Sequence, residues 1–120
     1  MRAIFKNLTP KAAFDKYADV EVEKPVEFFL SNFIYEGYTD LKTICRTYAR
    51  EAVDAEDGLA TTEEIEHVAK LLEQYIREYV KKIGGLKNLK LYTEDECNEI
   101  SERIFDEAVK MIDYYLRRIR

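Results

Sequence analysis

The sequence predicts an all-α protein, folded as a single antiparallel (up-and-down) helical bundle of about five helices, three of them long. Apolar residues recur with the 3.6-residue period of amphipathic helices, and no segment shows the period of two that marks a half-buried strand. Gly and Pro number only four and two, too few for the many tight turns of an all-β protein. The length of 120 residues suits one domain, residues 1–120.

Proline and glycine mark the boundaries of the first helices. Pro10 and Pro25 stand where a first helical residue is expected, because proline fits the first turn of a helix and little else in it. Gly37 and Gly58 stand where helices end. The expected helices cover about 10–18, 25–36, 40–57, 62–83 and 94–119.

Capping residues mark the starts of the three long helices. Thr39 is expected to cap the first of them. Thr61 with Glu64, and Thr93 with Glu96, have the spacing of capping boxes. The segment before Thr93, Leu86 to Tyr92, is expected to be an extended linker.

The apolar stripes of the three long helices predict a shared core. Six residues on these stripes are expected to be buried together: Ile44, Tyr48, Leu72, Ile76, Ile100 and Ile104. Cys45 and Cys97 fall on the same apolar faces and are expected to be buried free thiols, since two cysteines are too few for a disulfide scaffold.

Charge and composition exclude several classes of protein. There are 19 basic and 24 acidic residues, a net charge of −5, which disfavours non-specific binding of nucleic acid. No apolar run approaches the ~20 residues that span a membrane, and residues 1–7 lack the apolar core of a signal peptide. We therefore expect a cytoplasmic protein. The single Gln and the many Glu, Ile and Tyr residues are typical of a thermophile.

Motifs for catalysis are weak. His67 is the only histidine, and the sequence has neither a G-x-S-x-G motif nor a phosphate-binding glycine loop. Glu64 and His67 form one E-x-x-H match, whereas a helical di-iron site needs two. An alternative function is therefore a metal-dependent enzyme or metal-binding bundle that uses clustered glutamates. The glutamate pairs with the required spacing are Glu63/Glu66, Glu96/Glu99 and Glu99/Glu102.

Two charged clusters run against helix rules. Asp54, Glu56 and Asp57 crowd a helix C-terminus, where carboxylates oppose the helix dipole. A weakly bound divalent cation would relieve them, and we expect no other cofactor. The alternative is an exposed acidic loop.

The second cluster is the basic stripe Lys42, Arg46 and Arg50, at successive four-residue spacing. It is a candidate surface for an anionic partner. A further alternative function is a small nucleic-acid-associated subunit that uses this stripe. The competing interpretation is a solvated face whose charges are neutralised by acidic residues of a neighbouring helix.

The last helix carries more apolar surface than one core needs. Its apolar residues cover about half of the circumference, whereas packing on one core takes about 100°. The surplus residues, Phe105, Val109, Ile112 and Leu116, predict the interface of a homo-oligomer, most simply a two-fold dimer. The competing explanation is that the first helix and the 86–91 linker cover them. The leading hypothesis is a small non-enzymatic helical protein that acts through self-association and protein–protein contacts.

Overall fold

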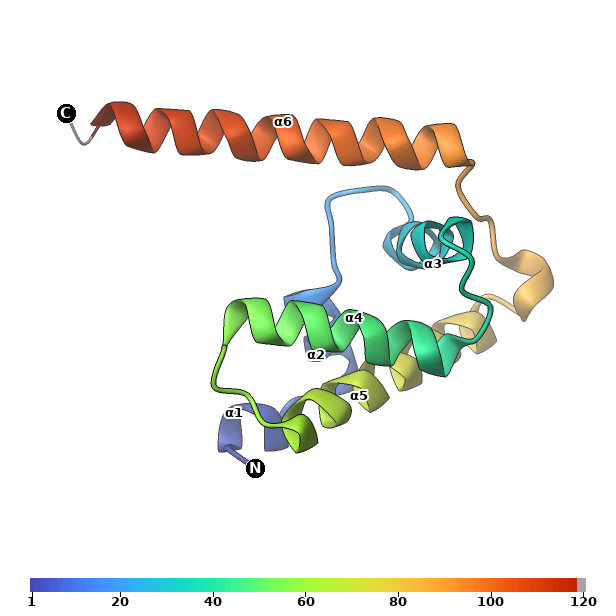
Figure 1. Ribbon diagram of the computed structural model, residues 1–120. Coiled ribbons are helices and arrows are strands. Elements are labelled where there is room, and N and C mark those ends of the chain that lie inside the picture. The colour runs from blue at the N-terminus through green and yellow to red at the C-terminus, as the bar shows by residue number, and fades with distance from the viewer. Residues whose placement is uncertain (119–120) are drawn as a thin grey trace.

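The computed structural model describes residues 1–118, and they are all-helical, as predicted (Figure 1). No strand occurs in this part of the chain. The α-helices are α1 (Ala3–Lys6), α2 (Pro10–Tyr17), α3 (Pro25–Tyr35), α4 (Leu41–Glu56), α5 (Thr62–Lys82) and α6 (Glu94–Arg118), with one 3₁₀ turn, η1 (Leu86–Asn88), between α5 and α6.

The helix boundaries lie within a residue or so of the predicted ones, and residue 119 lies outside the described residues. Two elements were not predicted: α1, and η1 inside the segment expected to be extended. Gly84 and Gly85 adopt φ values of 100° and 111°, which only glycine adopts readily, so the chain turns sharply after α5.

The predicted capping boxes form at α5 and α6. At α5, the Glu64 amide donates to Thr61 Oγ1 at 3.1 Å and the Thr61 amide donates to Glu64 Oε1 at 3.0 Å. The cap of α4 is Asp40 rather than Thr39: its carboxylate accepts from the Thr43 amide at 3.0 Å. Asp40 precedes Thr43 by the three residues that this hydrogen bond requires.

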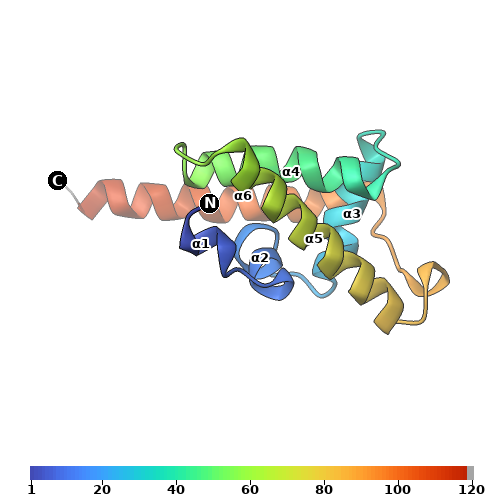
Figure 2. The same cartoon turned by 90° about the horizontal axis from the view of Figure 1, so that it is seen from below.

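The core lies among α2, α3, α4 and α5. The helices α4 and α5 form an antiparallel hairpin, and α2 packs on α5 (Figures 1 and 2). Ile44, Leu72 and Ile76 are buried as predicted, and Tyr48 packs against them half-buried. Aromatic rings fill the remaining space, with Phe14 stacked on Tyr75 at 4.7 Å between ring centroids.

The helix α6 stands apart from this core. Ile100 and Ile104 were expected in the core, but they are half-buried and outside its cluster. The main packing partner of α6 is α3, which lies across its first turns. The rest of α6 runs alongside the body, and its C-terminal end projects past it (Figures 1 and 2). A single antiparallel bundle of five helices is therefore not confirmed.

The molecule is less compact than its length requires. Its radius of gyration is 15.8 Å, against roughly 14 Å for a compact chain of this length. Its accessible surface is 8522 Å², about 1,700 Å² more than the roughly 6,800 Å² typical of a compact monomer of 14.2 kDa. The projecting helix accounts for this shape.

The core assignment predicts a large cost for removing Leu72. Leu72→Ala is expected to lower the free energy of unfolding by about 2–5 kcal/mol, through lost burial and the cavity left behind. Leu59→Ala is the control, because Leu59 is 84% exposed and should lose no more than about 0.5 kcal/mol. Urea denaturation measures both, and equal losses would contradict the assignment.

Candidate association surface

Hydrogen bonds around Tyr92 fix the base of α6 to α3. The Tyr92 amide donates to Ser31 Oγ at 3.0 Å, and the Tyr35 hydroxyl donates to the Tyr92 carbonyl at 2.6 Å. The Lys24 amide donates to the Tyr92 hydroxyl at 3.1 Å. Cys97, one turn into α6, is 3% exposed. The start of α6 is therefore held by both backbone and side-chain contacts.

The polar contacts between α6 and the body end at Arg103. Its guanidinium donates to the Glu21 carbonyl at 3.3 Å. Beyond it, the side-chain hydrogen bonds and ion pairs of α6 within the described chain stay inside the helix, as in Arg117 with Asp113 at 3.1 Å. Within residues 1–118, the second half of α6 therefore has no side-chain hydrogen bond or ion pair to the body.

This free half carries the α6 apolar face, which we define as Phe105, Val109, Ile112 and Leu116. Phe105 is 68% exposed and Leu116 is 60% exposed, and the other two are also exposed. Met111 and Tyr115 are exposed too, and the 100° step per residue places them on the neighbouring side of the helix. The structure thus leaves in solvent the residues that the sequence singled out as surplus.

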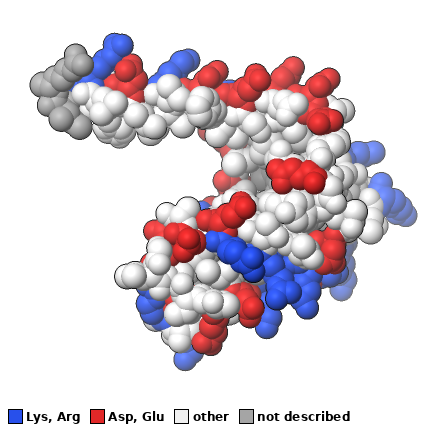
Figure 3. Space-filling model, viewed as in Figure 1, with Lys and Arg blue, Asp and Glu red and all other residues white. Residues whose placement is uncertain are grey.

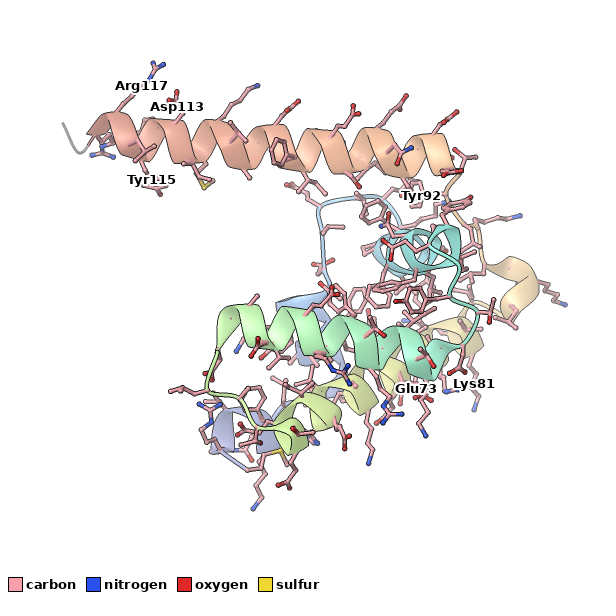
Figure 4. The ribbon with its side chains drawn as sticks, viewed as in Figure 1. Glu73, Lys81, Tyr92, Asp113, Tyr115 and Arg117 are labelled. Carbon is pink, nitrogen blue, oxygen red and sulfur yellow. The ribbon has the colours of Figure 1, made fainter. Side chains whose placement is uncertain are left out.

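A notch separates this half of α6 from the body. Figure 3 shows charged atoms along the outer edge of α6 and uncharged surface along the edge that faces the notch. In Figure 4, Tyr115 points toward the notch, while Asp113 and Arg117 point away from it. The helix is therefore amphipathic along its free half, with its apolar side unpartnered within residues 1–118.

The intrachain cover that the sequence left open is not formed. The first helix expected from the sequence is α2, which packs on α5 and buries its Phe14 in the core. The turn η1 also packs on α5, and Leu91 is exposed. Neither segment is available to cover the α6 apolar face.

Two residues of the acidic cluster at the end of α4 form ion pairs with basic side chains of the same chain. Asp57 forms an ion pair with Arg2 at 2.8 Å, and Glu56 forms one with Lys16 at 3.4 Å. Asp54 lines a surface groove beside Arg50. Within residues 1–118, no group of three His, Cys, Asp or Glu side chains is placed to hold a metal ion. Cation binding by Asp54, Glu56 and Asp57 stays a prediction.

Arg2 also pairs with Glu64, a contact that could not be predicted from the sequence because the two residues are 62 positions apart. Arg2 Nε and Nη2 each donate to the buried Glu64 carboxylate at 3.0 Å, and the Arg2 amide donates at 2.9 Å. These bonds, with the one from the Thr61 amide, lower the pKa of Glu64 to about 2. The Glu64 carboxylate is therefore occupied by hydrogen bonds to Arg2 in the N-terminal segment.

The basic stripe lies along a groove between α4 and α5. A hollow of ≈ 220 Å³ is lined by Lys42 and Arg46 from α4, and by Glu66, Lys70 and Glu73 from α5. Arg46 lies 3.8 Å from Glu66, and Arg50 lines the adjoining groove. Acidic residues of α5 thus neutralise the basic stripe in part. Partner binding by Lys42, Arg46 and Arg50 stays a prediction.

The two cysteines and His67 lie wholly or partly inside the protein. Cys45 and Cys97 are buried free thiols, as predicted, and burial raises the pKa of Cys45 to about 12. His67, expected on the polar surface, is half-buried, and its Nε2 has no hydrogen-bond partner in residues 1–118. The buried carboxylate of Glu27 accepts from the Tyr79 hydroxyl at 2.7 Å. Burial and this bond raise the pKa of Tyr79 to about 12.

Comparison with protein-family models, curated proteins and solved structures found no match. None of the helices within residues 1–118 combines the length and the apolar character that crossing a membrane requires.

The Arg2–Glu64 contact predicts a specific dependence of stability on pH. The pKa of Glu64 falls from 4.5 to about 2 on folding, so its stabilisation is complete above pH 4.5 and is lost as the pH falls toward 2. Wild type should therefore be more stable than Glu64→Gln at neutral pH, and this difference should shrink across that window. Urea denaturation at several pH values measures it.

The control for this measurement is Glu63→Gln, because Glu63 is the exposed neighbour of Glu64 on the same turn. Its difference from wild type should be small and should change little over the same range. A Glu64→Gln difference that stays constant down to pH 2 would contradict the proposed role of Arg2.

Proposed function

We propose that the chain is a non-enzymatic helical protein that acts by self-association through the α6 apolar face, most simply as a two-fold homodimer, and that the assembly then makes further protein–protein contacts. The single observation that carries the proposal is the exposure of Phe105, Val109, Ile112 and Leu116 on a helix whose polar contacts to the body, within residues 1–118, end at Arg103. Exposed apolar patches of this kind mark association sites in proteins.

The surface area of the molecule supports the same proposal. A standard interface takes about 800 Å² from each partner. The surface in excess of a compact monomer is about 1,700 Å², so one copy has the area that such an interface needs without giving up any of its core. A closed two-fold dimer is the commonest arrangement by which a patch buries itself against its own copy.

The state of the chemically capable residues supports a non-enzymatic role. Glu64 is engaged with Arg2, and both thiols are buried with raised pKa values, which leaves little thiolate at neutral pH. The sequence predicts that α6 packs antiparallel to helices of its own chain. In the proposed dimer, α6 packs against the second chain instead.

Replacing apolar side chains of α6 by glutamate tests the proposal. In sedimentation or light scattering at micromolar concentration, wild type should have about twice the mass of one 14.2 kDa chain. Phe105→Glu and Leu116→Glu should each raise the dissociation constant at least about tenfold, because a buried charge would have no partner. The helix content by circular dichroism should show the core intact.

Tyr114→Glu is the matched control. Tyr114 is 56% exposed on the same helix, but the 100° step per residue places it opposite Leu116 and Ile112. It should leave the dimer in place. A monomeric wild type, or equal effects of the control and the two test variants, would refute self-association through this face.

A further inference from the structure

We infer that the second copy docks antiparallel, helix α6 against helix α6, with the two-fold axis passing between residues 110 and 111. This inference rests on the proposed self-association and specifies the geometry of the interface. It is carried by the spacing of the α6 apolar face, by the uneven charge along α6 and by the position of α3.

The spacing of the α6 apolar face reads the same in both directions. From Phe105 the successive steps are four, three and four residues, to Val109, Ile112 and Leu116. An antiparallel pair centred between residues 110 and 111 therefore sets Phe105 level with Leu116 of the partner subunit, and Val109 level with Ile112 of the partner subunit. All four side chains then find an apolar counterpart at one register.

Charge along α6 selects this orientation over the parallel one. Residues 94–106 carry six acidic side chains and one basic, a net charge of −5, whereas residues 107–118 carry two acidic and three basic, a net charge of +1. A parallel pair would set the two acidic halves side by side, and like charges oppose association. In the antiparallel register, residues 103–106 of one helix lie beside residues 115–118 of the partner subunit, which include two arginines, and most acids of residues 94–102 lie past that segment. The two acidic halves are thereby kept apart, and the pair also opposes the two helix dipoles.

The position of α3 fits the same geometry. It covers the first turns of α6 and leaves the second half free, so the free halves of two antiparallel helices meet each other. The two bodies then lie at opposite ends of the pair. In this register Arg118 of the partner subunit lies level with Arg103, close to Glu102 and to the connection that carries Glu21 and Glu23.

Distances between spin labels distinguish the two orientations. Nitroxides are attached singly at Glu99→Cys or Lys110→Cys, in a full-length background with Cys45→Ala and Cys97→Ala whose dimer mass and helix content match wild type. Both sites lie on the outer side of α6. In an antiparallel pair, the two labels at residue 110 are separated only by the lateral distance between the helices. The two labels at residue 99 are in addition offset by ~35 Å along the helix axis. A parallel pair gives equal distances at both sites.

Charge reversal provides a second measurement that needs no labels. Arg117→Glu with Arg118→Glu, and separately Glu102→Lys with Asp106→Lys, should each raise the homodimer dissociation constant about tenfold, because each change sets like charges near each other in the antiparallel pair. Mixing the two double variants should restore wild-type affinity. In a parallel pair, either double variant exchanges one like-charge contact for another and leaves the affinity nearly unchanged.

The outcomes separate this inference from the proposed function. A dimer that dissociates on Leu116→Glu but gives equal label distances, or one indifferent to both charge reversals, overturns the antiparallel geometry and leaves self-association standing. A protein that gives no intermolecular distance at either site and remains monomeric overturns both. Unequal distances with restored affinity on mixing support both.

Discussion

The apolar side of α6 is longer than α3, the element that packs on it within residues 1–118. The helix has 25 residues, and α3, which packs on it, has 11, so their lengths are about 37 Å and 16 Å. The other short elements are already used, since α1 and η1 both pack on α5. Burying a Phe, Val, Ile or Leu side chain is worth about 1.5–3 kcal/mol, and the four residues of the α6 apolar face forgo most of this in the isolated chain.

The body from which α6 projects is held by contacts between distant segments. Arg2 joins the start of the chain to Glu64 at the start of α5 and to Asp57 at the end of α4, so one guanidinium forms ion pairs with two carboxylates. Tyr79 and Glu27 join α5 to α3 in the same manner. These contacts stabilise the α2–α5 body as one unit. Because the base of α6 is hydrogen-bonded to α3, the direction in which α6 projects is set by that unit.

Local features of the fold could be predicted from the sequence, and distant ones could not. The capping box at Thr61 and Glu64 depends on residues three positions apart, so its spacing in the sequence was sufficient. The surplus apolar residues of α6 were also recognisable, because a helical wheel needs no knowledge of neighbours. The pairing of Arg2 with Glu64 had no such signature. The placement of Ile100 and Ile104 in the core failed because periodicity shows that a face is apolar but does not show what covers it.

Hydrogen exchange of the α6 backbone at increasing protein concentration tests the central claim, that the free half of α6 needs a second molecule. The free half of a helix in water frays readily, since most helical stability in proteins comes from packing. Amides of residues 105–118 should exchange quickly in dilute solution and become protected as the concentration rises into the micromolar range. Amides of residues 97–104, held by α3, should change little. Equal protection of residues 105–118 at every concentration would contradict the account.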